Sequence, residues 1–275
     1  MTSTGDRPGD AVDQAMGAWL HGVVHRVDPA TLTGVTGIDG SQLSVIRAAG
    51  LTAVVSRVPL AQYGQEPLRR NLEDLSWLER AARAHHIVVD ALFHAGPVVP
   101  ARLATVYLDE ARVAGLLTKR RAEFVAGLRR VVGRAELGVK AYPVATPDAA
   151  PQSAPDSVSP GAAYLRKRRT QLTAQAEDRQ RAALDATAVH TALAGRAAAA
   201  RRHPPQDRRL SGADTAMVLN GAYLVDRGRL AEFTELVATL RKRHPAVRLE
   251  LTGPWPPYSF IGDETPLPGA VEPVR

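Results

Sequence analysis

The first half of the chain alternates between short apolar runs and segments with helical spacing. Strands are predicted where β-branched and other apolar residues follow one another over about five to eight positions. Helices are predicted where leucines and other apolar residues recur at three- and four-residue steps. The predicted strands are residues 19–26, 44–48, 51–58 and, as a proline-flanked edge strand, 96–106; the predicted helices are residues 72–85, capped by Asn71, and 109–132.

The second half opens with a predicted strand at residues 136–142 and closes with the best-patterned segment of the chain. In that segment, strands at 216–226 and 247–251 flank a helix at 230–244. Residues 161–202 have helical composition, and one helix of that length would span about 60 Å at about 1.5 Å per residue. Because its leucines form only a broken stripe and Gly195 lies inside it, we expect several packed helices there.

These elements predict an α+β protein with two domains, because 275 residues is long for one core. In the second half the order strand, helix, strand, helix, strand needs one more strand, sought near residues 208–210, to complete a ferredoxin-like domain. The predicted organisation is a disordered tail at 1–17, an N-terminal α+β domain at 18–132, a ferredoxin-like domain at 133–252 with a proline-rich loop (143–160) and a helical extension (161–202), and an extended tail at 253–275.

The start of that last tail is the least random stretch of the sequence, Leu-Thr-Gly-Pro-Trp-Pro-Pro-Tyr-Ser-Phe at 251–260. Its prolines remove backbone donors and fix φ, so we expect a stiff, extended strip. Burial of each aromatic side chain is worth about 1.5–3 kcal/mol, so we expect Trp255 to be largely buried against its own chain. The strip is interpreted as an interdomain clasp, with a partner-binding strip as the alternative; its residues are Gly253, Pro254, Trp255, Pro256, Pro257, Tyr258 and Phe260.

Composition and charge narrow the class of protein. A hydrophobic content of 45% is that of a soluble globular chain, and the absence of cysteine excludes disulfides and thiol nucleophiles. No run reaches the length of a spanning helix and no signal-peptide pattern opens the chain, so we expect a cytoplasmic protein. The net charge of +7 calls for an acidic partner. Its arginine clusters lack interleaved aromatic residues, so a basic nucleic-acid-binding protein is kept only as the alternative function.

A search for reaction chemistry finds no catalytic constellation. His21 and His25 lie four residues apart, which on a strand separates them by about 13 Å, too far to share a metal ion. His85 and His86 point in different directions on a helix. No Gly-x-Ser-x-Gly elbow, dinucleotide-binding loop or phosphate-binding loop occurs. We therefore expect no enzyme, no metal site and no cofactor.

Four stretches together resemble the gas vesicle protein L/F family. The most specific is the tail motif, which follows the strand at 247–251. The others are Gly161-Ala-Ala-Tyr-Leu-Arg-Lys-Arg168, Leu219-Asn-Gly-Ala-Tyr-Leu-Val225 and the segment that begins Gly96-Pro-Val-Val-Pro100. Within the last segment the sequence departs from the family pattern, since Ala101, Leu103 and Ala104 stand where a larger apolar residue, an aromatic residue and a glycine are expected.

The resemblance implies an accessory protein for gas vesicle assembly, without enzymatic activity, located at the vesicle or in the cytoplasm. It also implies two α+β domains, the second ferredoxin-like with inserted helices. Its expected partners are the small apolar shell protein and other vesicle accessory proteins; no membrane is expected, and nucleic acid is the less favoured partner. The motifs do not separate an L-type from an F-type member. Because arginine clusters can meet acidic protein surfaces, the candidate partner-binding site is the basic helix start at Arg166, Lys167, Arg168 and Arg169.

Overall fold

The computed structural model describes residues 15–144, 160–205 and 216–261. The chain divides into two compact units, Met1–Val132 with Ile261–Arg275, and Gly133–Phe260. Each unit contains an antiparallel sheet with helices, so the prediction of an α+β protein is confirmed. Predictions for residues 1–14, 145–159, 206–215 and 262–275 lie outside the described residues, and these include the additional strand sought near 208–210.

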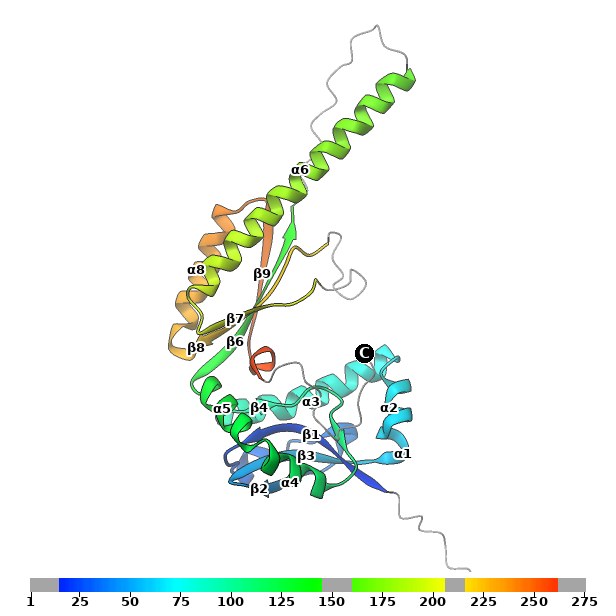
Figure 1. Cartoon of the computed structure of the whole chain (residues 1–275), viewed down its shortest axis with the longest axis vertical. Coiled ribbons are helices and arrows are strands. Elements are labelled where there is room, and N and C mark those ends of the chain that lie inside the picture. The colour runs from blue at the N-terminus through cyan, green and yellow to red at the C-terminus, as the bar shows by residue number, and fades with distance from the viewer. Residues whose placement is uncertain (1–14, 145–159, 206–215, 262–275) are drawn as a thin grey trace, which may run out of the picture. The chain divides into compact units, whose positions relative to one another are not determined.

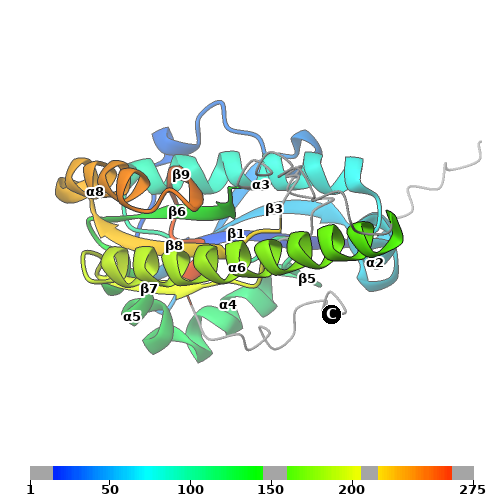
Figure 2. The same cartoon turned by 90° about the horizontal axis from the view of Figure 1, so that it is seen from above.

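The first unit is a sheet in the order β2-β3-β1-β4, with β5 also paired to β1. Helix α3 lies on one face of this sheet, and α4 and α5 lie on the other (Figure 2). Its elements are β1 (Met16–Val24), η1 (Pro29–Leu32), η2 (Ile38–Gly40), β2 (Leu43–Ala48), β3 (Leu51–Pro59), α1 (Leu60–Tyr63), α2 (Gln65–Asn71), α3 (Leu75–Ala95), β4 (Val99–Pro100), β5 (Val106–Tyr107), α4 (Glu110–Lys119) and α5 (Arg121–Val131).

Two helix predictions in this unit are wrong in their limits. Asn71 ends α2, and α3 begins after Asp74, whose carboxylate accepts hydrogen bonds from the backbone N–H groups of Ser76 and Trp77 at 2.8 and 3.2 Å. Aspartate caps a helix as well as asparagine does, so composition alone could not place the start. The helix expected at 109–132 is broken at Arg120, which has φ −108° and ψ 22°.

The second unit is a four-stranded sheet in the order β7-β8-β6-β9, with all neighbouring strands antiparallel. Its long helices α6 and α8 cover one face, as Figure 1 shows, and pack on Leu137 and Val139 of β6. Phe260 packs on the other face against Ala222 and Leu224. The elements are β6 (Arg134–Pro143), α6 (Pro160–Ala194), β7 (Ala199–Arg202), β8 (Leu219–Asp226), η3 (Arg227–Arg229), α8 (Leu230–Arg243), β9 (Val247–Trp255) and η4 (Tyr258–Phe260).

The expectation of several packed helices at 161–202 is wrong. Helix α6 runs unbroken for 35 residues, about 52 Å at about 1.5 Å per residue, and residues 199–202 form strand β7. Among the side chains of α6 that the structure describes, the buried ones, Ala182, Ala186, Val189 and Leu193, all lie in the C-terminal half. The N-terminal half extends beyond the sheet (Figure 1), where no sheet requires an apolar face. Leu172 and Leu184 are exposed, and the buried stripe of the C-terminal half consists mostly of alanine and valine, so the leucines did not mark the face that packs on the sheet.

Candidate partner-binding surfaces

The backbone of the tail motif continues an edge strand. Among the described strands, β9 pairs with β6 alone. The register shifts so that Thr252 lies opposite Gly138 while Trp255 lies opposite Glu136. The intervening Gly253 and Pro254 form a bulge. Gly253 has φ +105°, and a Cβ on it would lie 2.8 Å from the carbonyl oxygen of Glu136. Only glycine fits this position without displacing the neighbouring strand.

The buried residues of the motif are not the predicted ones. Pro256, Pro257 and Phe260 are buried, whereas 42% of Trp255 and 38% of Tyr258 is exposed. The prediction that Trp255 is largely buried is therefore wrong. Trp255 is exposed because strand β9 continues along the sheet edge through this residue. The chain turns onto the sheet only at the two following prolines. Phe260 takes the place in the packing that we expected for Trp255.

A buried carboxylate fixes the turn that follows the prolines. Glu136, 8% exposed, accepts hydrogen bonds from the backbone N–H and the hydroxyl of Ser259, both at 2.7 Å. Burial raises the pKa of the Glu136 carboxyl, and the two hydrogen bonds from Ser259 oppose that rise by favouring the ionised form. Nε2 of His203 lies 2.9 Å from the Ser259 hydroxyl oxygen. We call Glu136, Ser259 and His203 the tail lock.

The order of the hydrogen bonds in the tail lock suits a structural role, in which they hold the tail on the second sheet. The Ser259 hydroxyl donates its proton directly to the carboxylate, so His203 can only donate to the same oxygen. In a serine nucleophile the histidine would stand between the hydroxyl and the acid. None of the three residues of the tail lock was predicted from the sequence as a site residue. The single hint in the sequence was a carboxylate, Glu136, at the start of the predicted strand 136–142, between Ala135 and Leu137.

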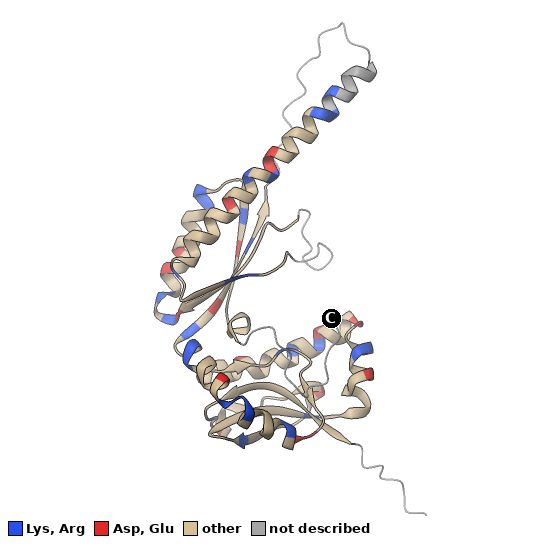
Figure 3. Cartoon of the chain, in the orientation of Figure 1, with Lys and Arg blue, Asp and Glu red and all other residues tan. Residues whose placement is uncertain are grey.

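The second predicted site, the basic start of α6, lies on the part of the helix that extends beyond the sheet (Figure 3). Arg166, Arg168 and Arg169 are exposed; the side chain of Lys167 is outside the described part of the chain. Leu172 is 52% exposed and shares the helix surface with Arg168 and Arg169, at steps of four and three residues. The N-terminal part of α6 and the turn that follows β9 lie at opposite ends of the second unit (Figure 1), so the fold does not join the two predicted sites.

The first unit contains a buried polar cluster that the sequence analysis did not predict. The indole N–H of Trp19 donates to Nδ1 of His85 at 3.1 Å, so the proton of His85 is on Nε2, 3.2 Å from the Ala101 carbonyl. Nε2 of His21 lies 2.7 Å from the Ser56 hydroxyl, and the two imidazoles stack with centroids 5.1 Å apart. Burial lowers the pKa of His85 to about 4 and that of His21 well below its ordinary value.

This cluster is built as a neutral core element, since both imidazoles are buried. His25, expected on the same strand face as His21, follows the end of β1 and is exposed. No group of three or more potential metal ligands occurs within residues 15–144, 160–205 and 216–261. Among these same residues, no helix is long and apolar enough to cross a membrane.

The segment that departs from the family pattern is buried at the edge of the first sheet. Val98 and Val99 are buried, and Ala101 is 7% exposed. Ala104 has φ +64°, a conformation that favours glycine, and its side chain is 1% exposed. This geometry explains why a glycine is the expected residue at position 104.

The fold and the tail lock together define a two-sheet α+β protein whose Gly-Pro-Trp-Pro-Pro segment is fixed onto the second sheet. The family model described as "Gas vesicle synthesis protein GvpL/GvpF" matches residues 17–262. The chain belongs to this family, which the sequence motifs predicted. This membership does not favour the nucleic-acid-binding alternative.

Two relatives from Streptomyces sp. (strain CB03234) cover nearly the whole chain. Gas vesicle protein L is 42% identical over 249 residues, which are 89% of this chain and 92% of the relative. Gas vesicle protein F is 26% identical over 258 residues, 90% of this chain and 100% of the relative. Two crystal structures share the fold. GvpF from Anabaena sp. PCC7120 has a TM-score of 0.62 at 19% identity, with 91% of this chain and 98% of that chain covered. GvpF from Microcystis aeruginosa has a TM-score of 0.60 at 18% identity, with 89% and 98% covered.

Proposed function

We propose that this protein is a non-enzymatic accessory protein of gas vesicle assembly, acting in the cytoplasm or at the vesicle. In this proposal it binds the small apolar shell protein or another accessory protein. The observation that carries it is the extended half of α6, an exposed helix surface with Arg168, Arg169 and Leu172 side by side on a chain of this family. Such a surface can pair charge with an acidic partner and bury apolar area at the same contact.

The proposed role follows from the chemistry of an assembling shell. A small subunit with apolar surface and open strand edges aggregates in water until it is incorporated. A partner that covers part of this surface, and that is steered to it by charge, keeps the subunit available for assembly. The arginines supply the charge, and the exposed side chain of Leu172 supplies the apolar contact.

The test is co-purification with the major shell protein from cells that make vesicles. We expect reversal of Arg166, Lys167, Arg168 and Arg169 to glutamate to abolish co-purification and vesicle formation. The matched control reverses the same number of exposed basic residues on the first unit, Arg57, Arg69, Lys119 and Arg129, and should keep both. Equal loss in the two variants would assign the effect to net charge and remove the basic helix from the proposal.

We also propose that Gly133–Phe260 is a ferredoxin-like domain with α6 as its extension, and that the tail acts as a clasp between domains. The first point is supported by the order β7-β8-β6-β9 and by the two split strand-helix-strand crossovers. The second is supported by Ile261, the residue after the lock, which belongs to the first unit and packs against its core. Ile261→Asp should then raise amide exchange in the first unit, while Tyr258→Asp, at an exposed position, should not. An unchanged exchange pattern in Ile261→Asp would exclude the clasp.

A further inference from the structure

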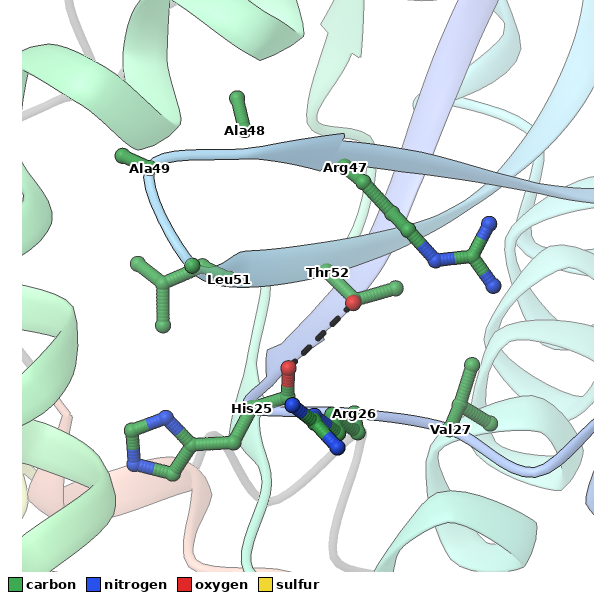
Figure 4. A pocket seen from close by; sticks show the side chains of 9 residues that line it. His25, Arg26, Val27, Arg47, Ala48, Ala49, Leu51 and Thr52 are labelled. Carbon is green, nitrogen blue, oxygen red and sulfur yellow. Dashed lines mark hydrogen bonds between the residues drawn. The ribbon is translucent and has the colours of Figure 1, made fainter.

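A cavity of about 500 Å³, open to solvent on one side, lies at the end of the first sheet, between the segment that follows β1 and the β2–β3 hairpin (Figure 4). Its volume is within the range of about 300–1,000 Å³ that small-molecule sites occupy. The hairpin turns at Ala49 and Gly50, which have φ +52° and +75°. Nε of Arg121 donates to the Ala49 carbonyl at 3.0 Å, so the turn that forms one wall is held in place.

The charges that line the cavity are all of one sign. Arg26, Arg47 and His25 are its ionisable lining residues, and no carboxylate lines it. In Figure 4 the Arg47 side chain leaves β2 toward the segment that carries Arg26. Both arginines are exposed, and within the described parts of the chain the side chain of neither Arg26 nor Arg47 makes a hydrogen bond or an ion pair. Two guanidinium groups therefore face the cavity without a compensating anion.

The floor of the cavity adds a third donor. Thr52 lies opposite Arg47 in the register of β2 and β3, so both side chains are on the same face of the sheet. Its side chain is 3% exposed, and its hydroxyl donates to the His25 carbonyl over a long 3.4 Å. A hydroxyl in such a long bond can rotate to donate to a ligand instead.

We propose that this cavity binds an oxyanion group, phosphate or carboxylate, between the guanidinium groups of Arg26 and Arg47. Guanidinium presents paired donors in the geometry that both groups accept. The lining contains no Phe, Tyr or Trp on which a nucleobase could stack, which favours a small anion or an acidic side chain over a nucleotide. The proposal does not depend on the role of α6, because all the residues concerned belong to the first unit.

The experiment is titration calorimetry of the full chain at fixed ionic strength with two probes, inorganic pyrophosphate and a hexaglutamate peptide. We expect at least one probe to bind and both Arg26→Gln and Arg47→Gln to weaken its binding about tenfold or more. The control is Arg57→Gln, which removes the same charge from an exposed position of β3 outside the cavity and should change affinity less than about twofold. Melting temperatures of all variants verify folding.

The two probes separate the possible sources of the group. Pyrophosphate binding that depends on Arg26 and Arg47 supports a free phosphate ligand, and hexaglutamate binding with the same dependence supports a carboxylate on a partner. The proposal is overturned if neither probe binds at concentrations up to about 1 mM, which corresponds to about −4 kcal/mol. It is equally overturned if Arg57→Gln weakens binding as much as the cavity variants do.

Discussion

Replacement of Ser259 by alanine tests whether the tail lock holds the Gly-Pro-Trp-Pro-Pro segment on the second sheet. The change removes the hydroxyl that donates to Glu136 Oε1 at 2.7 Å and leaves the backbone N–H that donates to Oε2 at 2.7 Å. Glu136, which is only 8% exposed, therefore loses one of the two hydrogen bonds that Ser259 donates to its carboxylate. A hydrogen bond to a charged group contributes about 1.5–3 kcal/mol, so we expect the lock to weaken by that amount.

Amide hydrogen exchange measures the weakening of the tail lock at the tail itself. A local measurement is needed because a chain with two units need not unfold in one step. Amides in a peptide covering residues 255–261 should exchange about ten- to hundredfold faster in Ser259→Ala, the factor that corresponds to about 1.5–3 kcal/mol. Ser76→Ala is the matched control, since it removes a hydroxyl from an exposed position in the first unit. Exchange in its tail peptide should equal that of the unaltered protein.

A double-mutant cycle tests whether the faster exchange in Ser259→Ala comes from the loss of the hydrogen bond between Ser259 and Glu136. Glu136→Gln keeps the size of the side chain and removes its charge, so Ser259→Ala should cost less in that background than in the unaltered protein. The difference should be about 1 kcal/mol or more. If Ser259→Ala leaves exchange in the tail unchanged, or if the two changes are additive, the carboxylate does not hold the tail and the reasoning fails.

Three further predictions concern packing, pH and backbone conformation. Phe260→Ala should lower the unfolding free energy of the second unit by about 3–5 kcal/mol, and Trp255→Ala, at a position 42% exposed, by less than half as much; equal losses in urea titrations would contradict the burial pattern. Burial lowers the pKa of His85 from about 6.5 to about 4, so between these two pH values the unfolded chain binds more protons than the folded chain. Stability should therefore fall by about 3 kcal/mol as the pH drops from about 6.5 to 4, and a melting temperature independent of pH there would refute this. Ala49→Gly should raise stability by about 0.5–1 kcal/mol, since φ at Ala49 is +52°, whereas Ala48→Gly in the adjoining strand should lower it; a melting temperature that does not rise in Ala49→Gly would show that the turn is unstrained.

The sequence by itself determined the elements whose stability is local. The β2–β3 hairpin, strands β6 and β8, and helix α8 lie within a few residues of their predicted limits. In each of them the apolar pattern runs through the whole element, and a turn residue next to it ends the element, such as Gly50 in the hairpin. The tail motif also identified the family, because its run of glycine, proline and aromatic residues is compositionally improbable elsewhere. The bulge at Gly253 gives a physical reason for the glycine in that motif.

Only the tertiary structure decided which residues of the tail are buried and what holds them. Glu136 and Ser259 are separated by 123 positions, and no local pattern pairs residues at that distance. Trp255 is exposed because β9 ends at an open sheet edge, a property of strand order that no single segment encodes. Likewise, half of α6 needs no apolar stripe because the sheet it would cover ends before the helix does, so its periodicity could not indicate its length. Local spacing predicts an element, whereas burial depends on which surfaces the rest of the chain places against it.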